Sequence, residues 1–175
     1  MTIARHSRPA ELQGVSLGKI AEGYVARFRD RKADWAAFED AKLDGFRRAQ
    51  HRFIGAGGSG KVGDVTVIPP GGFTLSIMFV PPGEGNAAHT HEVEEVFFVL
   101  QGFLDVFIED EEGEREEVRL GPWECISCPP GVIHGYENKS LEPVYFQVML
   151  GKAQPETMGY ADQKLFERRG AHLEA

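Results

Sequence analysis

The chain has 175 residues, which is enough for one domain with a real hydrophobic core and too few for two ordinary domains. Its composition, 42% hydrophobic and 26% charged, is that of a folded globular protein and excludes extensive disorder. The formal net charge of -8 argues against nucleic acid as a partner, because phosphate binding requires a face rich in Lys and Arg.

No stretch of the sequence predicts a membrane span or an export signal. The longest apolar runs, such as 97–100, have the length of a strand, whereas a helix needs about 20 apolar residues to cross a bilayer. The start, MTIARHSRPAEL, has basic side chains, but no apolar stretch follows it as in a secretory signal. We therefore expect a cytoplasmic protein without a membrane partner.

The first part of the chain predicts an arm that contains one helix. Residues 1–30 have no strong periodicity, whereas large apolar side chains recur at three- and four-residue spacings from Ala33 to about Arg52. Asp34 is placed to cap this helix. We expect its aromatic stripe to pack on the domain or on a second subunit, and we predict a homodimer to which the N-terminal segment contributes. The stripe consists of Trp35, Phe38, Phe46, Ala49 and Phe53.

A glycine-rich stretch, GAGGSGKV at 55–62, is a near match to the phosphate-binding pattern GxxxxGK[ST]. Gly55, Gly60 and Lys61 fit the pattern, but Val62 stands where a magnesium-binding hydroxyl is needed. The loop should also open a helix, whereas the GDVTVIPPGG that follows predicts a strand and a turn. We interpret the stretch as a flexible loop that leads into the main domain, and not as a nucleotide site.

From there to residue 150 the chain is a succession of short strand-like runs separated by turn sequences. The acidic tip EDEEGEREE, at 109–117, is interpreted as a solvated hairpin and not as a cation site. Many short strands without intervening helices indicate an antiparallel sandwich or barrel. The predicted strands are Val65–Ile68, Phe73–Val80, Glu94–Leu100, Leu104–Ile108, Glu117–Leu120, Glu124–Ser127, Ile133–Glu137 and Val144–Leu150.

These elements divide the chain into three parts. Residues 1–61 form the N-terminal arm and helix, residues 62–150 form the β domain, and residues 151–175 form a C-terminal tail. A short helix is predicted in the tail near Asp162–Arg169. The organisation is therefore that of one domain with an extension at each end.

The stretch HTHEVEE, which begins at His89, holds two histidines and three carboxylates, the residue types that bind metals. In a strand, side chains two residues apart share a face. His89, His91 and Glu95 then lie together on one face. Glu92 and Glu94 point to the opposite face, so we predict that Glu95 is the carboxylate that joins the two histidines.

The face that carries these three residues becomes apolar at Phe97 and Val99. Unpaired polar groups are costly to bury there, and a bound metal would remove that cost. A further ligand should come from another strand, where PPGVIHGYEN offers His134, although a single histidine is more often an ordinary buried one. We expect solvent exposure for the remaining histidines, His6, His51 and His172.

These residues resemble the two sequence motifs of the cupin family. The first motif, G(x)5HxH(x)3–4E(x)6G, is matched by Gly83, His89, His91, Glu95 and Gly102. In the second, G(x)5PxG(x)2H(x)3N, the leading glycine is replaced by Trp123, and the nearest glycine, Gly121, is two residues early. We expect a bulge around Pro122 and Trp123 that leaves the ligands unaffected. The second motif is otherwise matched by Pro129, Gly131, His134 and Asn138.

The resemblance covers about residues 62–150 and implies a small single-domain bacterial metal cupin. Its fold would be all-β, a double-stranded β-helix or jelly-roll barrel, here with an N-terminal helical arm. The resemblance also implies one divalent metal ion, and three imidazoles with one carboxylate would leave two positions of a six-coordinate ion open. Fe(II) is favoured, with Mn(II), Ni(II) and Zn(II) as further candidates. The implied ligands are His89, His91, Glu95 and His134.

Two open positions let a substrate chelate through two oxygens, or let substrate and O2 bind side by side. Tyr136 shares a strand face with His134 and is a candidate catalytic proton donor behind the ligands, although a packing role fits it equally well. Alternation cannot choose between Met78 and Ile77, or between Phe146 and Gln147, because both strands carry bulky residues on both faces. The candidate pocket residues are Phe97, Val99, Met78 and Phe146.

By analogy with other small cupins, we predict an Fe(II) dioxygenase that cleaves a carbon–carbon bond. Its substrate would be a small chelating diketone, enol, or hydroxyketone or aromatic compound. One alternative is a non-oxidative metal cupin, an isomerase or a lyase. The other is a metal- or small-ligand-binding protein without catalysis.

Overall fold

A computed structural model of the whole chain describes residues 6–174. Two α-helices are present in this range, α1 (Leu17–Tyr24) and α2 (Gln163–Glu167). Short 3-10 turns occur at Ala10–Leu12, Phe28–Asp30, Asp40–Lys42, Gly57–Ser59 and Ala171–Leu173. The strands are β1 (Ala49–Ile54), β2 (Thr74–Val80), β3 (His89–Thr90), β4 (Glu95–Gln101), β5 (Leu104–Glu109), β6 (Arg115–Leu120), β7 (Cys125–Cys128), β8 (Ile133–Glu137), β9 (Val144–Leu150) and β10 (Gly159–Tyr160).

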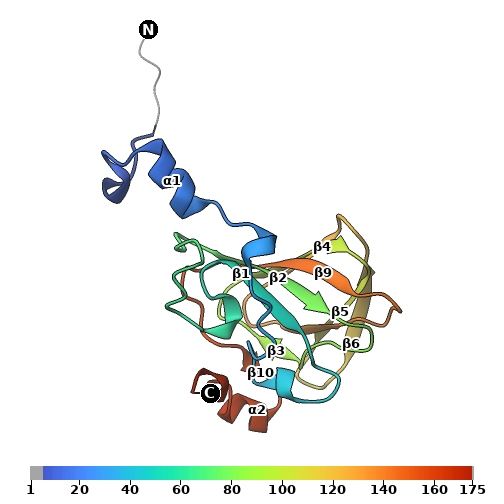
Figure 1. Cartoon of the computed structure of the whole chain (residues 1–175). Coiled ribbons are helices and arrows are strands. Elements are labelled where there is room, and N and C mark those ends of the chain that lie inside the picture. The colour runs from blue at the N-terminus through green and yellow to red at the C-terminus, as the bar shows by residue number, and fades with distance from the viewer. Residues whose placement is uncertain (1–5, 175) are drawn as a thin grey trace.

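The strands form two five-stranded sheets, in the orders β1-β2-β9-β4-β7 and β10-β3-β8-β5-β6. Neighbouring strands in both sheets run antiparallel. Figure 1 shows the sheets wrapped into one barrel, with α1 standing out from it on the N-terminal side and α2 lying beside β10. The predicted all-β double-stranded β-helix with an N-terminal helical arm is therefore confirmed.

Alternation along the central strands places the core between the two sheets. In β4 the buried positions are Glu95, Phe97 and Val99, and the residues between them are only partly buried. β9 alternates in the same way from Val144 to Leu150. This period of two is expected of strands with one face on a core, and it confirms that Glu95 shares its face with the apolar residues that follow.

The helix predicted from Ala33 to Arg52 is wrong. Gly45 interrupts this segment in a left-handed conformation, at φ 83°, which ends any helix there. Asp34 instead forms an isolated bridge with Gln50, through backbone hydrogen bonds of 2.9 and 3.0 Å. The residues of the predicted stripe therefore belong to two different elements, an irregular segment and the strand β1, and their helical spacing is fortuitous.

The N-terminal α-helix lies earlier in the chain, at α1. The side chain of Ser16 caps it by accepting a hydrogen bond from the backbone of Lys19 at 3.3 Å. The C-terminal helix predicted near Asp162–Arg169 is confirmed as α2, which Asp162 caps through Leu165. No helix within residues 6–174 is long and apolar enough to cross a membrane.

The strand predicted at Val65–Ile68 is also wrong. Ile68 makes a single parallel bridge with Ile54, and Val65 is 95% exposed. Pro69 and Pro70 follow directly, and proline has no backbone N–H with which to continue a ladder. The remaining seven predicted strands coincide with β2 and β4 to β9 within a few residues.

The sheets extend beyond residues 62–150, because β1 and β10 form two of their edges. The chain ends that carry these strands also bury two histidines. His51, on β1, is 8% exposed, and His172 is 3% exposed with its Nε2 donating to the carbonyl of Ser59 at 2.7 Å. The expectation that both are solvent-exposed is therefore wrong, whereas His6 is exposed as expected.

Trp123 adopts the conformation of the glycine that it replaces in the second motif. Its φ is 73°, and among residues 6–174 it is the one non-glycine residue with a positive φ. Its backbone N–H donates to the carbonyl of Val99 at 2.9 Å, and the neighbouring β4–β9 ladder shifts register between Val99 and Gln101. The turn is thus kept at the cost of a left-handed tryptophan, and the ligand positions are undisturbed.

Candidate metal centre

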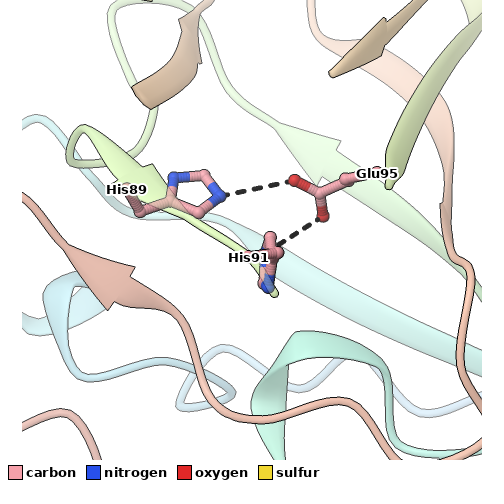
Figure 2. A group of neighbouring side chains, drawn as sticks. All are labelled: His89, His91 and Glu95. Carbon is pink, nitrogen blue, oxygen red and sulfur yellow. Dashed lines mark hydrogen bonds and ion pairs between the residues drawn. The ribbon is translucent and has the colours of Figure 1, made fainter. Parts of the chain in front are cut away.

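Three buried side chains converge at the point where β3 leads into β4. The Nε2 atom of His89 lies 3.4 Å from one carboxylate oxygen of Glu95, and Nε2 of His91 lies 3.5 Å from the other. Figure 2 shows the two imidazoles approaching the carboxylate from different sides. One ligand atom from each residue lies within 4.8 Å of the others, so a single ion could contact all three.

His134 meets the same carboxylate from β8. Its strand pairs with β3 so that His134 stands directly opposite His89 in the ladder. The Nε2 atom of His134 lies 2.8 Å from Oε2 of Glu95, and the side chains of all four residues are nearly fully buried. His134 therefore joins the cluster through Glu95, while the ligand atoms that lie within 4.8 Å of one another belong to His89, His91 and Glu95.

The hydrogen bonds of His134 imply a positive charge between it and Glu95. Its Nδ1 lies 2.7 Å from the carbonyl of Val132, and because a carbonyl only accepts, Nδ1 must donate. Nε2 of the neutral ring then has only a lone pair, yet it faces a carboxylate oxygen, which also only accepts. Two acceptors at 2.8 Å need a proton or a metal cation between them.

In the protein alone, a proton can fill this position. Burial would lower the pKa of His134, but the hydrogen bond to Glu95 and the charge of that carboxylate raise it above its usual value. Burial would likewise raise the pKa of Glu95, but the three surrounding histidines hold it well below its usual range. Glu95 is thus an ionised carboxylate, as metal coordination requires.

His91 supplies a second sign that the site fits a cation. Both of its ring nitrogens are buried and, within residues 6–174, neither has a hydrogen-bond partner. Burial lowers the pKa of His91 to about 4, so the ring is neutral and Nε2 can offer a lone pair. A buried polar atom without a partner costs about 1–3 kcal/mol, which coordination to a metal would offset.

Glu92 and Glu94 point away from this cluster, as alternation along the strand predicts. Glu92 accepts hydrogen bonds from the side chain of Lys152 and from the backbone of Glu156, at 3.2 and 2.9 Å. Glu94 accepts a hydrogen bond from the hydroxyl of Ser127. Neither carboxylate is directed at the histidines.

With this geometry established, comparison with known proteins assigns the family. Residues 76–150 match the family model described as Cupin domain, a range that holds all four clustered residues. This part of the chain is a cupin domain. No curated protein shows a significant sequence match to the chain.

Solved structures agree with this cupin fold. The polyketide cyclase RemF from Streptomyces resistomycificus is 21% identical, with a TM-score of 0.55 over 82% of this chain and 89% of its own. A point mutant of the oxalate decarboxylase OxdC from Bacillus subtilis is 18% identical, with a TM-score of 0.51 over 75% of this chain and 31% of its own. Peruvianin-I, a cysteine peptidase from Thevetia peruviana latex, is 13% identical, with a TM-score of 0.60 over 89% of this chain and 86% of its own. At these identities the likeness concerns the fold alone.

A small cavity, the metal cavity, adjoins the cluster inside this cupin barrel. Its volume is about 20 Å³, and His89, His91 and Glu95 form one side of it. Met78, Phe97 and Tyr136 line it, whereas Ile77, the alternative that alternation along β2 left open, does not. Val99 and Phe146, which were also predicted as pocket residues, are fully buried but do not line this cavity.

Tyr136 is a neutral phenol that can donate or accept a hydrogen bond, and it also packs against neighbouring rings. It is 4% exposed, and burial raises the pKa of its hydroxyl well above the usual value, so the hydroxyl stays protonated. Its ring contacts those of Phe97 and Phe146 edge to face, at centroid distances of 5.4 and 4.8 Å. Phe146 therefore supports the cavity from behind, by fixing Tyr136 and Phe97.

A second part of the lining of the metal cavity comes from a segment whose sequence did not indicate a role in the site. We call this part the N-terminal wall; its residues are Phe38, Arg48, Gln50 and Gly58. Three of them fall in the segment that was predicted as a helix, and Gly58 falls in the stretch interpreted as a flexible loop. Other lining residues not predicted from the sequence are Ser76, Asn86, Val148 and Met158.

A buried ion pair fixes the N-terminal wall. The guanidinium of Arg48 donates to Asp40 at 2.8 Å, and both side chains are at most 1% exposed. Asp40 also accepts from the backbone of Ala87 and from the hydroxyl of Tyr160, each at 2.9 Å. The carbonyl of Ala87 in turn lies 3.0 Å from Nδ1 of His89. Ala87 therefore connects the Arg48–Asp40 ion pair to a residue of the metal centre.

The glycine-rich stretch packs directly on the metal centre. Gly57–Ser59 is buried, and a side-chain carbon added at Gly58 would lie 3.1 Å from Cε1 of His91. A larger residue at Gly58 would therefore press on the ring of His91, and a glycine allows this close approach. This part of the stretch is therefore more than a connection into the main domain, because it forms part of the lining of the site.

Proposed function

We propose that this cupin is a metal-dependent enzyme, an Fe(II) dioxygenase that cleaves a carbon–carbon bond in a small chelating substrate. The observation that supports it is the convergence of three imidazoles and the ionised carboxylate of Glu95 on one enclosed cavity. Fe(II) bound there would supply a Lewis acid and a redox centre that orients both reactants. Four protein ligands leave room for two further oxygens in a six-coordinate site.

The charge of the site favours an anionic substrate. Glu95 contributes one negative charge, and burial keeps the neighbouring His91 neutral, so a divalent ion gives a net charge of about +1. An enolate or a carboxylate would neutralise this charge. Tyr136 remains protonated and can donate a hydrogen bond to such a substrate, while Phe97 and Met78 exclude water.

The metal cavity has room for about one water molecule at its present volume of about 20 Å³. A substrate therefore has to be small, and part of the wall has to move aside to admit it. We propose that Gly57–Ser59 is that part, because it has the least side-chain bulk of any segment lining the cavity.

A non-oxidative reaction is the second candidate, because the fold does not separate it from the first. Structures similar to this chain include one named a polyketide cyclase and one named an oxalate decarboxylase. The same ligand set could stabilise an enolate in an isomerase or a lyase without a redox change. A third candidate is a binding protein that takes a metal or a small ligand without turnover.

Parallel loading of purified protein with Fe(II) and with Zn(II) separates these candidates. Both forms would be screened with diketones, hydroxyketones and enols in an oxygen electrode, with anaerobic samples as controls. We expect oxygen uptake with the iron form alone, and substrate binding without turnover in the zinc form, because zinc has no accessible redox change. Equal turnover without oxygen uptake would establish the isomerase or lyase. Metal binding without any turnover would favour the binding protein.

We also propose that the protein is a homodimer. Figure 1 shows α1 standing out from the barrel, and its apolar side chains Leu17 and Tyr24 are 73% and 46% exposed. A second subunit would cover them. Light scattering at micromolar concentrations is expected to give twice the mass of one chain, and a monomer at every concentration would contradict the proposal. The net charge of -8 continues to argue against a nucleic-acid partner.

A further inference from the structure

Two polar residues of the N-terminal wall face the metal cavity from neighbouring positions. Arg48 immediately precedes β1 and Gln50 lies within it, and residues two apart in an extended chain share a face. Each side chain is 1% exposed, and both line the same cavity as His89, His91 and Glu95. Buried polar side chains beside a ligand cavity normally fix the orientation of what binds there.

The amide of Gln50 has one end occupied and one end free. Its Nε2 donates to the carbonyl of Ala56 at 3.3 Å and to the hydroxyl of Ser76 at 3.4 Å. Since a carbonyl only accepts, this contact assigns the nitrogen to that end of the amide. Oε1 is buried and has no donor among the residues that the structure describes. Gln50, a lining residue of the metal cavity, therefore has one free hydrogen-bond acceptor.

Arg48 supplies the complementary free donor. Its Nη1 donates to the carbonyl of Phe46 at 2.9 Å, and its Nη2 donates to Asp40 at 2.8 Å. Its Nε is buried and has no acceptor within residues 6–174. Asp40 already neutralises the charge of the guanidinium. Arg48 can therefore bind a ligand through a hydrogen bond from Nε, and not through an excess positive charge.

We propose that Gln50 and Arg48 recognise an α-hydroxycarbonyl ligand, meaning a compound with a hydroxyl on the carbon next to a carbonyl or carboxylate. The hydroxyl would donate to Oε1 of Gln50, and the carbonyl or carboxylate oxygen would accept from Nε of Arg48. This inference rests on the proposed metal-chelating function. It narrows the substrate class to hydroxyketones and hydroxy acids, because a diketone or a dicarboxylate has no proton to offer Gln50.

A buried acceptor of this kind distinguishes strongly between ligands with and without a hydroxyl. A site built to accept from a hydroxyl rejects an analogue without one, because the buried acceptor is then left unpaired. An α-hydroxycarbonyl group also places two oxygens on adjacent carbons, as metal chelation requires. Its smallest acid, glycolate, carries the single negative charge that the proposed site would neutralise.

Glycolate and oxalate therefore form a matched pair of probes. Both chelate a metal through oxygens on adjacent carbons, but only glycolate carries a hydroxyl. Co(II)-loaded protein would be titrated with each at pH 7, with the visible absorption of the ion as the readout, so that no turnover is required. Gln50→Met, which keeps the side-chain length and removes the acceptor, is the test variant.

We expect Gln50→Met to weaken glycolate binding by about tenfold, as loss of one buried hydrogen bond predicts, and to change oxalate binding by less than about twofold. Gln147→Met is the matched control. Gln147 lies on β9 between Phe146 and Val148, on the face turned away from the core, and does not line the metal cavity. This control should leave both affinities unchanged.

Cobalt content and the absorption spectrum without probe report whether the variant keeps its metal centre. If Gln50→Met does not fold, Ser76→Ala is the replacement variant, because it removes the hydroxyl that helps to orient the amide of Gln50. This contact is longer and weaker than a direct hydrogen bond to the ligand, so we expect glycolate binding to weaken by about two- to threefold. Equal effects on both probes, no effect on either, or no glycolate binding to the Co(II) protein would overturn the inference. Failure of the wild-type chain to bind cobalt would overturn the proposed function as well.

Discussion

The two sides of the metal cavity are built in different ways. The side that carries the ligands comes from β3 and the start of β4, where His89, His91 and Glu95 lie within seven residues of one another. The N-terminal wall is held by contacts between distant parts of the chain, such as those from Asp40 to Ala87 and to Tyr160, which span 47 and 120 residues. The first side is a local property of a strand, and the second is a property of the whole fold.

This difference explains what each side contributes to chemistry. The ligand side places one carboxylate and neutral imidazoles where a divalent ion could bind, and many small cupins could share that arrangement. The N-terminal wall places Arg48 and Gln50 in the lining of the same cavity, each with one buried hydrogen-bonding atom that has no partner among the described residues. We infer that the ligand side sets the class of reaction and that the N-terminal wall sets the choice of substrate.

The largest expected effect tests the ligand side. Alanine at any one of the four clustered residues removes a direct metal ligand, so we expect the affinity for Fe(II) or Co(II) to fall by more than the 10- to 100-fold that is typical of outer contacts. Elemental analysis after gel filtration measures the retained metal. The variants are His89→Ala, His91→Ala, Glu95→Ala and His134→Ala.

Neighbouring carboxylates supply the control for that series. Glu92→Ala and Glu94→Ala remove side chains that bind Lys152 and Ser127 on the other face, and they should retain the metal. Metal loss in Glu94→Ala together with retention in Glu95→Ala would contradict the assignment of the carboxylate ligand. It would also show that alternation along β4 does not decide which residues coordinate.

A second effect, on the free energy of unfolding and not on metal affinity, tests the N-terminal wall. Asp40→Asn leaves the guanidinium of Arg48 buried without its counter-charge, and breaking a buried pair in this way costs about 3–5 kcal/mol. Urea unfolding of the metal-free protein at pH 7 measures the loss. Glu22→Gln is the control, since it breaks the exposed pair with Lys19, which is worth at most about 1 kcal/mol.

The dependence of this effect on pH has a definite sign. Burial would raise the pKa of Asp40, but the charge and hydrogen bonds of Arg48 hold it below the usual 3.8. The stabilisation by the carboxylate is therefore complete above about pH 4 and is lost as pH falls through the lowered value. The stability difference between wild type and Asp40→Asn should stay constant from pH 7 to pH 5 and shrink below pH 4. A difference that grows in acid would contradict the role of the pair.

The same contrast shows how much could be predicted from the sequence. Seven strands and the convergence of His89, His91 and Glu95 follow from alternation, because each strand has one face on the core. The spacing of motif residues added His134. The irregularity expected at Trp123 is present as a positive φ, and the neighbouring β4–β9 ladder shifts register between Val99 and Gln101.

The N-terminal wall could not be predicted, for a physical reason. β1 is an edge strand whose conformation depends on pairing with β2, and its own residues are spaced like those of a helix. No local feature marks Arg48 or Gln50 as facing a cavity. The one available signal was composition, since an Arg and a Gln among large aromatic residues in a buried segment require partners.

The smallest expected effect concerns the contact between the N-terminal wall and the ligand side, where Gly58 lies beside His91. His91 has no hydrogen bond to orient its ring among the described residues, whereas metal-binding histidines usually have one. Its orientation therefore depends on packing, and Gly58 of the N-terminal wall is close enough to provide it. In Gly58→Ala the added carbon would lie 3.1 Å from Cε1 of His91, so the ring or the loop must shift by a few tenths of an ångström.

Because coordination depends on ring position, we expect Gly58→Ala to weaken metal binding on the order of tenfold, as loss of an orienting contact does. Competition with a chelator measures the dissociation constant. Gly72→Ala is the matched control: an added carbon there has no heavy atom within 4 Å, and neither glycine needs a positive φ. If Gly58→Ala lowers the stability of the fold but leaves the metal affinity unchanged, then the loop moves in place of the ring. The N-terminal wall would then act on the substrate alone and not on the metal centre.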